Sequence, residues 1–247
     1  MMLLAKKITL ILVLIALLIA LLNFFIGNPL SKYHVRNVAE EYLHDTYQDK
    51  DFHIEGITFD SKTRNYIVQI VSPSGIDSHF SVGISPGGNV LYDLYSNDVL
   101  GKYNTISRIQ DEYRDLAVPV LKSLNLTFNI PVITATIPFS FPDEKTEYDT
   151  SVNAIPVNKI QVDGLYNIRD LGKQAGLLDI EVAESNVSAE EVAEILTAIK
   201  STMDQAQIPF HAINIYLPST DTTPANSSDT LLKTILYEEI TETGSVE

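Results

Sequence analysis

The pentapeptide GISPG at residues 83–87 matches the G-x-S-x-G pattern, which in many hydrolases places a nucleophilic serine on a sharp strand-to-helix turn. Here the serine is followed by PGGNVLYDLY, which predicts a turn into another strand. Pro86 also lacks the backbone N–H that the residue after the nucleophile gives to an oxyanion hole. We therefore interpret Ser85 as part of a hairpin turn and expect no serine catalysis there.

Histidine and cysteine offer no metal-binding pattern. None of the five histidines has a partner at H-x-x-x-H spacing, although those at 53 and 79 could lie on neighbouring strands; the five are His34, His44, His53, His79 and His211. The chain has no cysteine, which excludes disulfides, iron–sulfur clusters and thiol catalysis. We therefore expect no metal ion and no other cofactor.

Adjacent carboxylates are frequent and could serve general acid–base catalysis if burial raised the pKa of one member. The pairs lie on faces of expected helices that should be exposed, or near the chain end: Glu40–Glu41, Asp111–Glu112, Glu190–Glu191 and Glu238–Glu239. We expect them to contribute solubility. An envelope hydrolase acting on glycan or peptide remains the alternative, and it would need two carboxylates about 5 to 9 Å apart.

Tyrosine is the dominant large aromatic residue, with twelve tyrosines and no tryptophan. Tyr92, Tyr95 and Tyr103 lie close in sequence to Asp93 and Asp98, a combination typical of recognition surfaces. We predict a recognition surface at these five residues. The alternative is that the tyrosines pack between a sheet and a helix.

The charge is unevenly distributed. The net charge is −15, and the first 39 residues hold four basic and no acidic side chains, so the remainder sets 13 basic against 32 acidic residues, a net −19. Such an acidic body argues against a nucleic-acid partner. Together with the absence of cysteine, this composition indicates a bacterial protein that works outside the cytoplasm.

The N-terminal part is strongly apolar. Residues 8–26 carry no charge, and as a helix they would be about 28 Å long, near the roughly 30 Å of a bilayer core. Lys6 and Lys7 precede them, which predicts a cytoplasmic tail at 1–7, a transmembrane helix at 8–26 and the rest of the chain outside. A secreted protein cut near Ala20 is the alternative, although large residues surround that position.

Helix and strand patterns divide the outer part into two domains. Residues 30–126 predict a cystatin-like domain in which a helix packs on a four-stranded antiparallel sheet and a second helix closes the unit. The expected elements are helix 33–48, strands 52–60, 65–72, 78–84 and 89–95, and helix 103–124. Ser31 is the expected cap of the first helix.

Residues 127–247 predict a second domain, a two-layer α/β sandwich. Its clearest element is the helix SAEEVAEILTAIKSTMDQAQ, where Ser188 and Glu191 form a capping box. The segments AINIYLP and LLKTILYEEI predict strands. The fold class of the whole chain is therefore α+β.

The segments GNPLSKY, EEYLHDTY, HFSVGIS, VLYD and EYRDLAVPVL occur in this order, and with them the chain resembles the YfjL-like family of uncharacterised single-pass membrane proteins from Bacillus and its relatives. The resemblance implies a short N-terminal anchor, a Gly-Asn-Pro exit and two outer units. It supplies no catalytic residues.

The expected function follows from the anchor and from the lack of a catalytic set. We expect a membrane-anchored, extracytoplasmic binding or regulatory protein of the bacterial cell envelope, and not an enzyme. Its expected partners are the membrane, through residues 8–26, and another envelope protein or a peptide.

Overall fold

The computed structural model describes residues 10–15, 17, 25, 27–124, 129–142, 152–184, 187–217 and 230–240. The chain divides into two compact units, Met1–Asn104 and Thr105–Glu247, which are described separately. This division comes earlier than the boundary expected after residue 126. The reason is that helix α3 (Tyr103–Lys122) buries Tyr113 and Leu121 in the core of the second unit.

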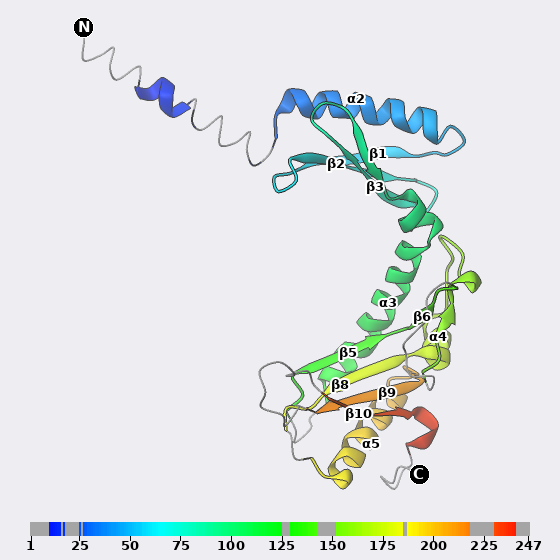
Figure 1. The fold of residues 1–247 in the computed structure, drawn as a ribbon. Coiled ribbons are helices and arrows are strands. Elements are labelled where there is room, and N and C mark those ends of the chain that lie inside the picture. Colours follow the sequence, from blue (N-terminus) through cyan, green and yellow to red (C-terminus); the bar gives the residue numbers. More distant parts are fainter. Residues whose placement is uncertain are drawn as a thin grey trace. The chain divides into compact units, whose positions relative to one another are not determined.

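The first unit is a helix on an antiparallel sheet (Figure 1). Helix α2 (Pro29–Thr46) lies along one face of the sheet, in which the strand order is β1-β2-β3-β4. The strands are β1 (His53–Asp60), β2 (Asn65–Val71), β3 (His79–Ile84) and β4 (Val90–Asp93). The four strands expected from alternation are thereby confirmed, with ends that differ by one or two residues.

Alternating apolar residues create the core of this unit. Tyr66, Val68 and Ile70 of β2 are buried, and each pairs with a buried residue of β3. Helix α2 contributes Val35, Ala39 and Leu43 to this core. These residues are four positions apart, the spacing that places side chains on one face of a helix. Burial of these two apolar faces against each other holds helix and sheet together.

The turn between β3 and β4 contains Ser85, as the sequence predicts. The Ser85 backbone N–H donates to the Asn89 carbonyl at 2.9 Å, and Gly88 adopts φ +88°. A Cβ on Gly88 would lie 2.6 Å from Nε2 of His34 on α2, so the turn fits closely beneath the helix. Ser85 is therefore a hairpin residue.

Helix α2 begins earlier than expected, and Asn28, not Ser31, caps it. The Asn28 Oδ1 atom accepts a hydrogen bond from the Leu30 backbone N–H at 2.9 Å, and Pro29 lies in the first turn, where its missing N–H costs nothing. Gly27, at φ +76°, turns the chain just before this cap. The prediction of Ser31 was wrong because it placed the helix start too late.

The predicted transmembrane helix at residues 8–26 is corrected by the structure. Within the part of the chain that is described, no helix is long and apolar enough to cross a membrane. The residues of 8–26 other than 10–15, 17 and 25 lie outside the described residues. The fold is α+β with mainly antiparallel sheets, and the membrane-spanning element is withdrawn.

The second unit packs helices against a four-stranded sheet of order β10-β9-β8-β5 (Figure 1). The pair β8–β9 is parallel, and the other pairs are antiparallel. The sheet strands are β5 (Val132–Thr136), β8 (Leu177–Glu181), β9 (Ala212–Leu217) and β10 (Thr230–Leu236). Beside α3, its helices are α4 (Ile168–Ala175) and α5 (Ala189–Gln205). Short elements complete it: β6 (Phe139–Ser140), β7 (Ile155–Pro156), η2 (Val157–Lys159) and η3 (Tyr237–Glu239).

The core of the second unit combines the apolar stripe of α5 with one face of the sheet. Ile195, Leu196 and Ile199 of α5 belong to the same buried cluster as Ile180 and Ile213 of the strands. The predicted capping box is confirmed, since the Ser188 and Glu191 side chains each accept a hydrogen bond from the other residue's backbone N–H. This cap stabilises the helix end by typically about 1 kcal/mol.

Candidate functional site

The structure places the five residues of the predicted recognition surface on both faces of the sheet at β4 and on the helices that follow. Asp93 and Tyr95 lie together beneath α2. Tyr92 covers Gly83 on the opposite face of the sheet, where a Cβ on Gly83 would collide with its ring. Tyr103, at the start of α3, is 40% exposed, and Asp98 lies in the short helix η1 (Ser96–Leu100). Their role in recognition stays a prediction.

Asp93 joins α2 to strand β4. The hydroxyls of Tyr42 in α2 and of Tyr47, the C-terminal cap residue of α2, each donate to Oδ2 of Asp93 at 2.7 Å. The Tyr95 backbone N–H donates to Oδ1, also at 2.7 Å. Because the acceptor is a carboxylate, these hydrogen bonds are stronger than those between neutral groups. The carboxyl is thus committed to holding the end of the helix.

Aromatic rings surround this connection. The ring centre of Tyr47 lies 5.4 Å from Phe52, 5.4 Å from Phe80 and 4.9 Å from Tyr95. The rings meet edge to face, which is a favourable arrangement for aromatic pairs. Tyr47 and Phe52 are only half buried, so part of this cluster faces solvent.

A depression of about 610 Å³ opens beside these half-buried rings. We call it the basic pocket; its lining residues are Arg36, Glu40, Leu43, His44, Tyr47, Gln48, Lys50, Phe52, His53 and Ile54. Its apolar part comes from the end of α2 and the start of β1. The volume lies in the range of small-ligand sites in proteins, about 300 to 1,000 Å³.

The charge of the basic pocket differs from that of the protein as a whole. Arg36 and Lys50 provide two cations, against Glu40 as the one acidic lining residue. Arg36 Nη1 lies 3.9 Å from Glu40 Oε1, and both side chains are about half exposed, so this ion pair is weak and leaves the arginine able to meet a ligand. His44 and His53 add polar nitrogens. The pocket therefore combines an aromatic wall with basic side chains.

A second, smaller depression of about 390 Å³ includes Asp98 in its lining. It also contains Glu55 and His79, together with the exposed Ile76. The Asn97 side-chain amide donates to Asp98 Oδ1 at 3.0 Å. This depression has acidic character, opposite to that of the basic pocket.

A polar row crosses the sheet of the second unit. Thr134, Asp179, Asn214 and Thr234 pair in register, one from each of the four strands. Asn214 Nδ2 donates to Asp179 Oδ1 at 2.8 Å, and Thr234 Oγ1 donates to Asn214 Oδ1 at 2.8 Å. Because these groups satisfy one another across the strands, the row is a structural network, and we assign no ligand to it.

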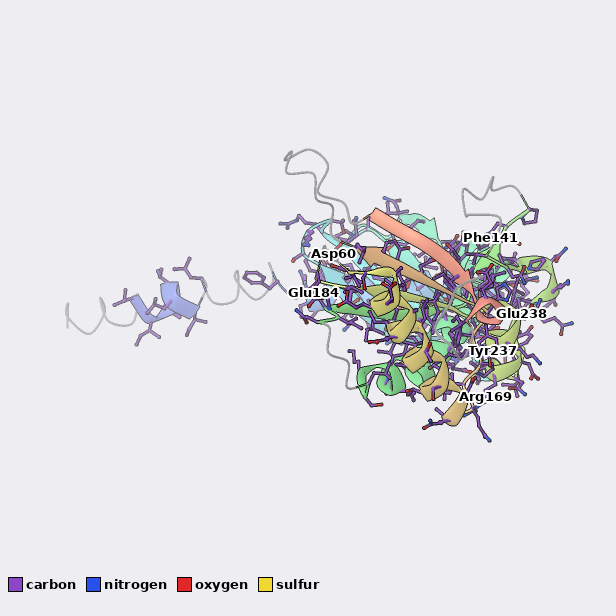
Figure 2. The ribbon with its side chains drawn as sticks, turned by 90° about the horizontal axis from the view of Figure 1, so that it is seen from below. Asp60, Phe141, Arg169, Glu184, Tyr237 and Glu238 are labelled. Carbon is purple, nitrogen blue, oxygen red and sulfur yellow. The ribbon has the colours of Figure 1, made fainter. Side chains whose placement is uncertain are left out.

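The adjacent carboxylates have structural roles where they are partly buried. Glu112 accepts from Arg108 Nη1 at 2.9 Å, and Glu191 belongs to the cap of α5. Glu239 accepts from the Leu236 backbone N–H at 3.0 Å. Its neighbour Glu238 is exposed on η3, where Figure 2 labels it beside Tyr237.

The histidines at 53 and 79 do not meet. Both face the same residue of β2, Val71, from opposite sides, so β2 separates them by two strand spacings, about 10 Å. Both are exposed. Among the residues that the structure describes, no group of three or more His, Cys, Asp or Glu side chains could hold a metal ion.

Tyrosine protonation makes the stability of the protein sensitive to alkaline pH. Burial raises the pKa of five tyrosines, and hydrogen bonding to Asp93 raises it further for two of them; the five are Tyr42, Tyr47, Tyr113, Tyr216 and Tyr237. These phenols stay neutral in the folded state when unfolded tyrosine, with a pKa of about 10, has already lost its proton. Their contribution is therefore complete below about pH 10 and is lost as the pH rises further.

We expect the free energy of unfolding to fall above pH 10, by about 1.4 kcal/mol per pH unit for each tyrosine that stays protonated only when folded. Urea unfolding at a series of pH values measures this slope. In Tyr47→Phe the slope should be smaller, because one of the responsible phenols is missing. A free energy of unfolding that stays constant between pH 9 and about pH 12 would show that these tyrosines are not protected.

Part of the site carries a signal in the sequence. Asp93 lies opposite Val82 in the sheet register, on the face toward α2, where an apolar residue is expected. Tyr42 and Tyr47 lie on the apolar face of the helix predicted at 33–48. An acidic residue at an inward strand position, with tyrosines on the apolar face of the predicted covering helix, therefore indicates a partly buried tyrosine–carboxylate connection. The sequence prediction missed it because it considered Asp93 only with its neighbours in sequence.

Two family models match the chain. The model described as the YfjL-like N-terminal domain matches residues 4–94, and the model described as the YfjL-like C-terminal domain matches residues 112–247. Both the basic pocket and Asp93 fall within the first match. No curated protein and no solved structure matches the chain significantly.

Proposed function

The chain belongs to the YfjL-like family in both of its domains, and from this premise we propose that it is a non-catalytic binding protein of the bacterial cell envelope. Its first unit binds a short acidic peptide segment of another envelope protein. The observation that carries this proposal is the basic pocket beside Tyr47 and Phe52.

The lining of the basic pocket favours a ligand that is both apolar and anionic. The half-buried rings of Tyr47 and Phe52 offer a surface for one apolar side chain. Arg36 and Lys50 offer donors to carboxylate oxygens, and arginine can bind a carboxylate through two parallel hydrogen bonds. A peptide with an aromatic or aliphatic residue beside aspartate or glutamate satisfies both requirements.

The charge of the whole chain supports the same ligand. Residues 40–247 carry a net −19, so most of the protein repels an acidic peptide. The basic pocket is a local exception to this negative charge. Repulsion elsewhere directs an acidic segment to the pocket and disfavours non-specific binding.

We also propose the cell membrane as the location, with attachment through the apolar residues 8–26 and both units outside the cytoplasm. The uncharged character of residues 8–26 supports the attachment, and the cysteine-free, acidic composition supports the location outside the cytoplasm in a bacterium related to Bacillus. Cell fractionation tests this: the protein should sediment with membranes, and recovery in the soluble fraction would contradict it.

A charge reversal in the basic pocket tests the binding proposal. Lys50→Glu should weaken the binding of a labelled acidic-aromatic peptide by about tenfold, because an attractive charge becomes repulsive at a partly exposed site. Fluorescence anisotropy measures the affinity. Lys62→Glu makes the same charge change just beyond the far end of β1, about 25 Å along the strand, and is the matched control.

The control peptide carries Asn and Gln in place of Asp and Glu. It should bind weakly to the native protein and to both variants. Equal loss of affinity in Lys50→Glu and Lys62→Glu would mean that only the overall charge matters, and it would remove the pocket from the proposal.

A further inference from the structure

The first turns of α2 expose large apolar side chains next to cations. Leu30 is 78% exposed and Tyr33 is 68% exposed, values that are unusual for residues of this size in a folded unit. Lys32 and Arg36 are exposed on the same turns. The first acidic residue of the chain is Glu40, so this part of the helix is free of negative charge.

This part of α2 is fixed directly to the end of the apolar N-terminal sequence. Gly27 is buried, and a Cβ there would lie 2.7 Å from the Tyr66 hydroxyl and 2.9 Å from Cγ of Phe59. The Asn28 N–H donates to the Tyr66 hydroxyl at 3.1 Å, and that hydroxyl donates to the Asn28 carbonyl at 3.0 Å. Gly27 and Asn28 are therefore part of the folded unit, directly before α2.

The short connection limits how far α2 can be from whatever holds residues 8–26. Four residues lie between Phe25 and Leu30, and the five residue-to-residue steps cover at most about 18 Å even in a fully extended chain. A bilayer that holds the apolar residues must therefore come close to the first turns of α2.

We infer that Leu30 and Tyr33, flanked by Lys32, form a lipid-contacting surface that lies in the headgroup region of a phospholipid bilayer. The inference rests on the proposed attachment of residues 8–26 to the membrane. Tyrosine is favoured at the membrane–water interface, where its ring meets lipid and its hydroxyl meets water. Leucine inserts at the headgroup boundary, and Lys32 faces lipid phosphates.

Charge favours a bilayer over a second copy of the chain as the partner of this surface. Two copies would bring together two bodies of net −19, which repel each other. Anionic lipid attracts the positive first turns of α2 and repels the acidic remainder. The negative charge that disfavours a dimer thus also directs the Leu30 end of the helix toward the membrane.

The chain has no cysteine, so a single introduced cysteine gives one defined labelling position. We would prepare the full chain as Leu30→Cys, Tyr33→Cys and, as the control, Thr46→Cys. Thr46 is exposed on the same helix, about 20 Å beyond Tyr33. Each variant carries an environment-sensitive fluorophore and is mixed with vesicles of equimolar phosphatidylcholine and phosphatidylglycerol, with or without brominated acyl chains.

The expected result is that all three variants sediment with the vesicles. At 30 and 33 the emission shifts to the blue and is quenched by brominated lipid, whereas at 46 neither occurs. Sedimentation with solvent-like emission at 30 and 33 would overturn the lipid-contacting surface but leave the membrane location standing. A protein that stays in the supernatant would overturn both. A blue shift that appears without vesicles and grows with protein concentration would assign the surface to a second copy.

Discussion

Replacing Asp93 with alanine lowers the free energy of unfolding of the first unit by an expected 3 kcal/mol or so. The substitution removes the acceptor of three hydrogen bonds, from the Tyr42 and Tyr47 hydroxyls and from the Tyr95 N–H. Hydrogen bonds to a charged acceptor contribute about 1.5 to 3 kcal/mol each, and the hydroxyls recover part of this from water because they are only partly buried. Hydrogen exchange of the β2 amides, which lie in the centre of that unit, measures the loss.

Asp98→Ala is the matched control for Asp93→Ala. Its carboxylate accepts from the neighbouring Asn97 side chain, a contact that joins no distant elements, so the expected cost is within about 0.5 kcal/mol. Tyr42→Phe and Tyr47→Phe should each cost about 1 kcal/mol, and each should cost less when Asp93 is already alanine. If the free-energy costs of Asp93→Ala and of a tyrosine substitution simply added in the double variant, the tyrosine and Asp93 would act independently.

Replacing Tyr113 with alanine should have the largest effect in the second unit, a loss of about 4 kcal/mol. Its side chain is completely buried, and its hydroxyl donates to the Pro209 carbonyl at 3.1 Å. Two glycines make room for the ring: a Cβ on Gly172 would lie 2.7 Å from Tyr113 Cε2, and a Cβ on Gly176 would lie 2.8 Å from Cζ. Removing a large aromatic side chain from such a site leaves a cavity, which costs about 3 to 5 kcal/mol.

Tyr113→Phe separates packing from hydrogen bonding, and it should cost only about 1 kcal/mol. Tyr103→Ala truncates a tyrosine in the first turn of the same helix that is 40% exposed, and its cost should be small. Hydrogen exchange of the β9 amides reports on this unit. A cost for Tyr113→Ala no greater than that for Tyr103→Ala would contradict the packing described here.

The local elements could be predicted because each has a pattern of its own. The apolar and polar residues of YIVQIV and HFSVGI alternate, and these segments form β2 and β3. Ser188 and Glu191 stand at the spacing of a capping box, and they form one. Pro86 excluded an elbow at Ser85, and the chain turns there. In these cases neighbouring residues alone determine the backbone.

Contacts between distant segments could not be predicted in the same way. Asp93 binds tyrosines that precede it by 51 and 46 residues, and no local pattern connects them. The apolar face of helix 103–122 shows that the helix packs, but not on which sheet. Its partner is decided by the space that Gly172 and Gly176 leave for Tyr113, about sixty residues later in the chain.

We propose that the basic pocket of the first unit binds an acidic segment without cleaving it. Titration of the ¹⁵N-labelled full chain with an acidic-aromatic peptide, followed by NMR, tests this most directly. We expect the amide signals of residues 43–54 to shift, those near Asp98 and Asp179 to stay unchanged, and the peptide to remain intact. Shifts centred away from residues 43–54, no shifts at all, or the appearance of cleaved peptide would contradict it.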